Sequence, residues 1–227
     1  MIIRSLAALV GAVMLMGAAP QPADPVLQAV IANARVAAPA SMSFERSTRA
    51  SAQRKGEAAQ PTTRTDRWDG KAFTLLSVNG KPPTPKEAED FKKAASSRPV
   101  PGYYRLADIL KAGAVRQADA QGRTVYRIAA LPKGSINVGK DVSANVTGEF
   151  LVDTSGPRPY VSRARFVLAK PVSFFMVARI DSLDIVNDYR LGPDGRPHLA
   201  RVTQAMSGAQ FGNEGSTRSE TSYTMLR

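Results

Sequence analysis

The chain has 227 residues, no cysteine, a single histidine and a formal net charge of +12. The missing cysteines exclude disulfides, thiol nucleophiles and thiolate metal sites, and one histidine excludes a metal site with two histidine ligands. The length is sufficient for one domain with a proper hydrophobic core.

Residues 1–19 have the pattern of a secretory signal peptide. Arg4 supplies a positive charge, and the apolar run 6–19 ends in small residues. This run is too short to span a bilayer comfortably, although a retained membrane anchor is the alternative. The cleavage site is expected after one of three alanines: Ala18, Ala19 or Ala23. We therefore expect an exported, periplasmic protein whose residues 20–227 form a single domain.

The first part of the expected domain mixes one helix with short strands. Asp24 can cap a helix over 25–37, and Pro25 suits its first position. Weak alternation predicts a strand over 41–51, and the polar stretch 53–65 is interpreted as a surface loop. The Asp69-Gly70-Lys71 turn then precedes an apolar strand over 73–78.

The middle of the chain interrupts the strands with two helices. Thr84 and Glu87 have the spacing of a capping box, which predicts a helix over 85–95. A second short helix is expected over 104–112. Both must pack on a face of the sheet, because nothing else is available to bury them. Two short strands are expected to follow, over 115–118 and 124–131.

The last part of the chain is a series of strands joined by short turns, which requires antiparallel pairing. The expected strands are 147–153, 160–168, 173–191, 199–204 and 218–226, and the last turn is expected at 212–215. Within 173–191, the apolar residues change face near Asp181 and Ser182. Such a change is typical of a bulge or sharp bend in a strongly curved sheet. The predicted fold class is therefore α+β: a curved antiparallel half-barrel, with an N-terminal helix and short helices covering its concave face.

Residues typical of catalysis are scarce. His198 follows Pro197 on an expected turn and is interpreted as structural or exposed. No Gly-x-Ser-x-Gly motif accompanies it. Asp181 and Asp184 should lie on opposite faces of a strand, whereas Asp188 shares the face of Asp184. We therefore expect no enzyme, no metal site and no cofactor.

The positive charge leaves two interpretations open. It suits an anionic partner such as an envelope surface, or it only keeps the protein soluble, because the Lys and Arg residues are scattered. An export signal argues against nucleic acid as the partner. We expect a monomer.

The order of elements resembles the LolA/LolB-type lipoprotein-carrier superfamily. The resemblance rests on that order and on two hairpin motifs, Asp69-Gly70-Lys71 and Asp194-Gly195, each before a strand. It implies an apolar concavity, lidded by helices, that binds lipid or acyl chains. No ligand residue of the family is carried over to this chain.

These observations favour a periplasmic carrier of a lipid or acylated ligand, such as a lipoprotein. The alternative is an envelope sensor or accessory protein that uses the same fold to bind another protein. The concave face of the sheet would be filled either by an apolar ligand or by the helices expected within 85–112. The candidate ligand-binding residues are large apolar side chains on the expected strands: Phe73, Leu75, Phe150, Phe166, Phe174 and Met176.

Overall fold

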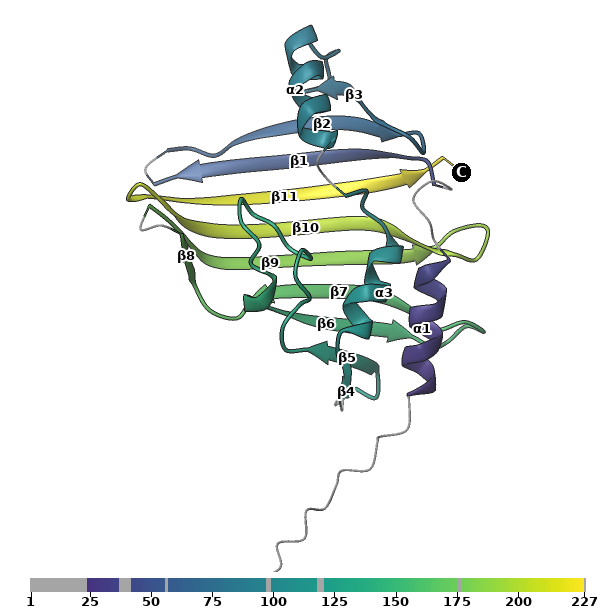
Figure 1. Cartoon of the computed structure of the whole chain (residues 1–227). Coiled ribbons are helices and arrows are strands. Elements are labelled where there is room, and N and C mark those ends of the chain that lie inside the picture. The colour runs from purple at the N-terminus through teal and green to yellow at the C-terminus, as the bar shows by residue number, and fades with distance from the viewer. Residues whose placement is uncertain are drawn as a thin grey trace, which may run out of the picture.

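The computed structural model describes residues 24–36, 42–55, 57–96, 99–117, 121–174 and 177–226 (Figure 1). The expected signal peptide at 1–19 and Met176 lie outside the described residues. The helices are α1 (Pro25–Arg35), α2 (Pro85–Ser96), the 3₁₀ turns η2 (Tyr103–Arg105) and η3 (Ser143–Asn145), and α3 (Leu106–Lys111). The strands are β1 (Phe44–Arg54), β2 (Gln60–Trp68), β3 (Phe73–Val78), β4 (Val115–Gln117), β5 (Thr124–Ile128), β6 (Val146–Asp153), β7 (Tyr160–Leu168), β8 (Val172–Phe174), β9 (Ala178–Leu191), β10 (Pro197–Gln210) and β11 (Asn213–Met225).

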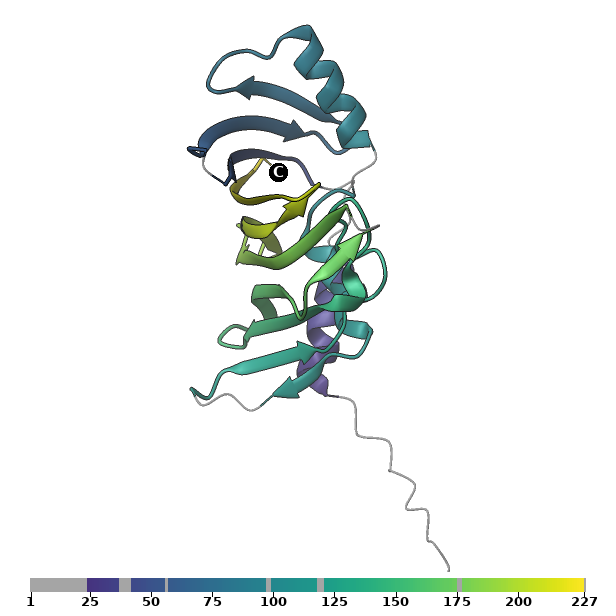
Figure 2. The same ribbon diagram turned by 90° about the vertical axis from the view of Figure 1, so that its left-hand side faces the viewer.

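The strands form one open antiparallel sheet of 11 strands. Its order is β3-β2-β1-β11-β10-β9-β7-β6-β5-β4, and β8 pairs with β9 off this path. The first and last strands of this order do not meet, so the sheet is a half-barrel. Figures 1 and 2 show the helices together on one side of it, which we call the inner face. The predicted α+β fold class is confirmed.

Helices α1 and α3 cover the half of the inner face formed by β5, β6, β7 and β9. Asp24 caps α1 as expected, since its Oδ1 accepts the N–H groups of Val26 and Leu27 at 2.9 and 3.2 Å. In η2, the Tyr103 hydroxyl accepts the Val161 N–H at 2.8 Å, at a register shift between β6 and β7. This bond satisfies a buried backbone donor that the shifted ladder leaves unpaired. The main hydrophobic core lies between these helices and the sheet.

Helix α2 packs separately, at the β3 edge of the sheet. Its predicted capping box is present: the Glu87 carboxylate accepts the Thr84 N–H at 2.7 Å, and the Thr84 hydroxyl accepts the Glu87 N–H at 3.3 Å. Phe91 and Ala95 of the helix bury against Leu75 in a small second cluster. Because this interface is small, α2 is held less firmly than α1 and α3.

The predicted bend near Asp181 is confirmed. Ser182 pairs with Ser207 and Ile180 pairs with Gly208, so Asp181 is the extra residue of a bulge. Gly208 is required opposite it, because a Cβ at this position would collide with the carbonyl oxygen of Arg179. The bulge explains why apolar side chains change parity along β9 but stay on the inner face.

Several expected boundaries were wrong. The stretch 53–65 is not a loop, because β1 extends to Arg54 and β2 begins at Gln60. The expected strand 173–191 is two strands, β8 and β9, which pair with each other as a hairpin. The last turn is at Phe211-Gly212, so the residues from Asn213 onward belong to β11. Strand pairing along the curved sheet overrides weak local preference in each case.

The outer face of the sheet carries rows of ion pairs. Arg165 binds Asp184 at 2.7 Å, and Asp188 binds both Arg163 at 2.7 Å and Arg201 at 3.2 Å. Asp184 and Asp188 share this face, as predicted from their spacing. These pairs are cross-strand and partly exposed, so each contributes little to stability.

Candidate functional site

The inner face has two chemically different halves. Between β5 and β9 it is apolar and lies under α1 and α3. Across β10, β11, β1 and β2 it carries small and polar side chains, including Gln204, Thr217, Ser219 and Thr48. Two hollows lie on this second half.

The first, which we call the hairpin hollow, lies at the β10–β11 turn end of the sheet and has a volume of about 750 Å³. Its apolar lining comes from the four strands β8, β9, β10 and β1 and includes Phe174, Ile180, Met206 and Ala52. The loop at 138–140 lies along its other side. This volume is within the usual range of about 300–1,000 Å³ for ligand sites.

Three cationic residues also line the hairpin hollow, Arg54, Lys140 and Arg179. The Lys140 ammonium lies 5.7 Å from the ring centre of Phe174, a cation–π arrangement that places a positive charge beside an apolar wall. Glu214 also lines it and pairs with Lys55 at 3.1 Å. The hollow therefore combines apolar surface with a positive rim.

The second, which we call the α2 hollow, lies between α2 and the strands β1, β2 and β3, with a volume of about 570 Å³. Phe73, Leu75 and Phe91 form its apolar side. The two hollows adjoin, because Ala50 in one and Ala52 in the other are successive inner-face positions of β1. Together they form a groove along the part of the sheet that α1 and α3 leave uncovered.

A buried carboxylate organises the floor of the α2 hollow. The Asp66 side chain is fully buried; Arg46 Nε donates to it at 2.6 Å, and Arg64 Nε lies 3.7 Å from its other oxygen. Each guanidinium lies over an aromatic ring, Arg46 over Phe73 at 4.6 Å and Arg64 over Phe91 at 5.1 Å. Arg64 therefore links the sheet to α2.

The outer face has a depression of comparable size, about 590 Å³. Its lining includes Arg49, Asp184, Arg218 and Glu220. Pro61, Val186 and Ala205 also line it, but this depression is more open to solvent than the hollows of the inner face and would enclose less of a ligand. We therefore place the candidate site on the inner face.

The structure distributes the expected ligand-binding residues over separate places. Phe150 and Phe166 lie in the main core, with ring centres 5.8 Å apart, under α1 and α3. Phe73 and Leu75 line the α2 hollow, and Phe174 lines the hairpin hollow. Met176 lies outside the described residues. All five described residues face the inner side, but they do not form one cluster.

Sequence reasoning missed residues that shape both hollows. Met206 lies in the part of β10 beyond the expected end at residue 204, and Arg46 and Asp66 are polar residues on an inner face that was expected to be apolar. Asp66 also falls just after the stretch interpreted as a loop. The alternation of Phe44 and Arg46 with outward-facing residues supported the predicted strand over 41–51, and the same period in Arg64, Asp66 and Trp68 could have revealed β2.

The titratable groups show no catalytic arrangement within the ranges described. His198 is the second residue of β10 rather than part of a turn, and burial lowers its pKa. Burial also raises the pKa values of Tyr103 and Tyr189, whose rings pack edge to face with centres 5.1 Å apart. No group of three potential metal ligands occurs among the described residues.

No family model matches the chain, and no curated protein shows significant sequence similarity to it. Among solved structures it matches the crystal structure of the LolA superfamily protein NE2245 from Nitrosomonas europaea. The identity is 14%, the match covers 89% of this chain and 94% of that chain, and the TM-score is 0.38. This is the superfamily that the order of elements resembles. A likeness this remote does not bear on ligand or function.

Across the ranges that the structure describes, no helix has the length and apolar character needed to cross a membrane.

Proposed function

We propose that this protein is an exported carrier that binds the acyl chain of a lipid or acylated protein in the hairpin hollow. The observation that carries the proposal is the apolar hollow of about 750 Å³ on the half of the inner face that the helices leave uncovered. Phe174, Ile180 and Met206 line it, and burying a ligand chain against them would remove apolar surface from water.

The rim favours an amphiphile over a purely apolar ligand. Arg54 and Lys140 are at hand for an anionic or strongly polar headgroup, while the chain lies on the strands. Charge near the opening and apolar surface deeper inside match the two ends of such a molecule. The Ser and Thr hydroxyls of the adjoining inner face offer further hydrogen bonds.

The export pattern at 1–19 supports a periplasmic location for this carrier. The sequence also supports binding rather than catalysis, because a single histidine and no cysteine leave few nucleophiles and bases.

The proposal is tested by identifying any lipid that co-purifies with the protein. The protein is purified from cells without detergent and extracted with organic solvent, and the extract is analysed by mass spectrometry. We expect an acyl-chain compound in a fixed molar ratio to protein. Absence of lipid together with a stable protein complex would instead support the accessory-protein alternative.

A further inference from the structure

The turn between β10 and β11 places a large apolar residue where the backbone is unfavourable. Phe211 and Gly212 form a two-residue turn, with φ of 50° and 79°. Positive φ at both positions is typical of a type I′ turn, whose first position favours Asn or Gly. A bulky residue in this region is uncommon and strained.

The Phe211 side chain contributes little to the stability of the fold. It is 71% exposed, the most exposed of the large apolar side chains in the described part of the chain. Its contribution to burial is therefore small, whereas Asn at this position would relieve the backbone. Phe211 is therefore unfavourable for the stability of the turn, but its exposed ring is well placed to contact an apolar surface outside the protein.

A second exposed apolar residue lies beside it. The Phe211 N–H donates to the carbonyl oxygen of Val177 at 2.6 Å, and the Val177 side chain is 43% exposed. Val177 precedes β9, so two separate hairpins meet at this point. Phe211 also borders the hairpin hollow, together with Phe174.

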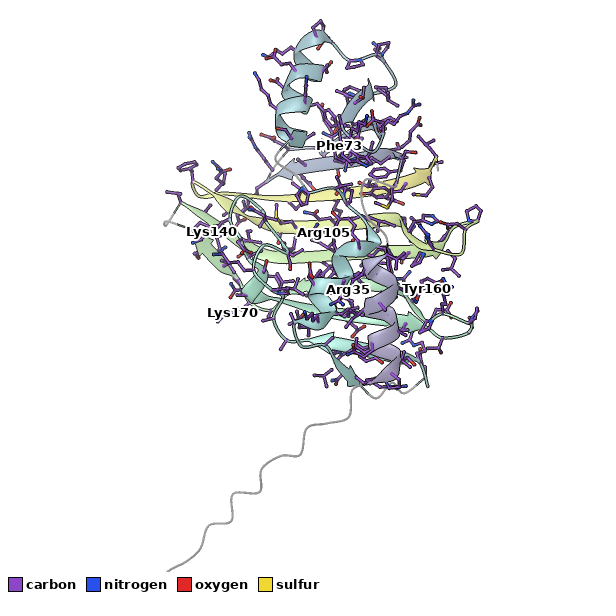
Figure 3. The ribbon with its side chains drawn as sticks, turned by 45° about the vertical axis from the view of Figure 1, so that its right-hand side comes forward. Arg35, Phe73, Arg105, Lys140, Tyr160 and Lys170 are labelled. Atoms are coloured by element: carbon purple, nitrogen blue, oxygen red, sulfur yellow. The ribbon has the colours of Figure 1, made fainter. Side chains whose placement is uncertain are left out.

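Cationic side chains surround this end of the sheet. Arg54, Lys140 and Arg179 line the hollow beside Phe211, and Lys55 follows directly after Arg54. Figure 3 shows Lys140 and Lys170 at the same end of the sheet, with Tyr160 toward the other end.

Four carboxylates belong to the same end: Glu57, Asp141, Asp181 and Glu214. Against the five cations and Lys133, which lies near Asp141, they leave a net charge of +2 here. Two of the five cations form exposed ion pairs, Lys55 with Glu214 and Arg179 with Asp181. Such pairs are weak in water and do not prevent the cations from interacting with an anionic surface.

We propose that this end of the molecule docks on an anionic lipid bilayer, with Phe211 and Val177 entering the interface and the surrounding Lys and Arg residues facing the headgroups. Apolar residues at a tip with cations around them are typical of reversible membrane attachment. The docked orientation brings the opening of the hairpin hollow to the bilayer. Docking itself requires no ligand, so it stands or falls separately from the proposed carrier function.

Vesicle cosedimentation tests the docking. The protein purified from cells is mixed with one of two kinds of vesicle. One kind contains phosphatidylcholine alone, and the other contains phosphatidylcholine with about 30 mol % phosphatidylglycerol. We expect binding to the anionic vesicles, weakened at about 0.5 M salt. Phe211→Asn should weaken this binding by about tenfold or more, because the buried ring is lost. The same substitution should leave the melting temperature unchanged or raise it, since Asn suits the turn.

Leu191→Asn is the matched control. Leu191 is 48% exposed and lies at the opposite end of the sheet, at the β9–β10 turn, so vesicle binding should be unchanged. Equal binding by wild type and Phe211→Asn would overturn the proposal, and so would an equal loss in Leu191→Asn. Failure of the wild type to bind either vesicle would overturn it as well, and binding of Phe211 to another protein would then be the remaining use of the tip.

Discussion

Arg46 on β1 and Asp66 on β2 lie directly opposite each other in register and share a hydrogen bond of 2.6 Å on the inner face of the sheet. The Asp66 carboxylate is fully buried. A buried carboxylate is tolerated only when cations and hydrogen bonds compensate for its lost hydration. Arg46 and Arg64 provide that compensation, and their stacking on Phe73 and Phe91 connects the ion pair to α2.

Replacing Arg46 alone should therefore be strongly destabilising. Arg46→Met removes the 2.6 Å hydrogen bond to the buried Asp66 carboxylate, and we expect the free energy of unfolding to fall by about 3–5 kcal/mol. Urea denaturation followed by circular dichroism measures the change.

The double variant Arg46→Met with Asp66→Leu is the control for this prediction. It removes both charges, so it should be more stable than Arg46→Met alone. A double variant less stable than the single one would show that Asp66 stabilises the sheet through other contacts.

Gly208 should be intolerant of any side chain. Gly208→Ala would push a Cβ into the Arg179 carbonyl at the bulge, and we expect a loss of about 1–3 kcal/mol in unfolding free energy. Gly156→Ala is the matched control, since a Cβ there meets open space. If both substitutions had the same effect on the denaturation midpoint, the close approach at the bulge would be absent in solution.

The capping carboxylate of α1 should make stability depend on acid pH. Desolvation raises the pKa of Asp24, but hydrogen bonds from Tyr126 and from the Leu27 and Val26 amides outweigh it, and the net pKa is lowered. A lowered pKa in the folded state stabilises the fold above the unfolded-state pKa of about 3.9, and this stabilisation is lost as pH falls through the folded-state value. Between about pH 5 and pH 3, the wild type should lose more stability than Asp24→Asn. If the free energy of unfolding fell by the same amount in the wild type and in Asp24→Asn over this pH range, the result would contradict this role of Asp24.

The elements that could be predicted from the sequence have strong local causes. Asp24 and the Thr84–Glu87 box mark helix starts by their own hydrogen bonds, and β7 is found at the predicted residues because its alternation is clean. The bulge at Asp181 was predictable because apolar residues that change parity within one strand can stay on one face only if an extra residue is inserted. In contrast, β2 was missed. Its residues alternate between the two faces as in a strand, but most of them are polar, which is not typical of strand composition.

The candidate site was less predictable than the fold. Phe150 and Phe174 have the same apolar character in the sequence, yet one lies in the core under the helices and the other at a hollow. The difference depends on which part of the inner face α1 and α3 cover, and that is a tertiary property. Met206 was missed for the same reason, because it becomes a lining residue only through the length of β10.

The most direct test of the carrier function is binding of a fluorescent acyl probe to wild type, Met206→Asp and Ala205→Asp. Met206 faces the hairpin hollow, whereas Ala205 is its neighbour on the outer face. A carboxylate would be buried against the acyl chain of the probe, which is unfavourable, so Met206→Asp should weaken probe binding by about tenfold or more. Ala52→Asp, at an exposed position of the same hollow, provides a second variant that spares the core.

Circular dichroism confirms that each variant is folded before the probe is added. Saturable binding by wild type and Ala205→Asp, with loss in Met206→Asp and Ala52→Asp, is the predicted result. Probe binding that is absent in wild type, or equal in all four proteins, would contradict a ligand site in the hairpin hollow.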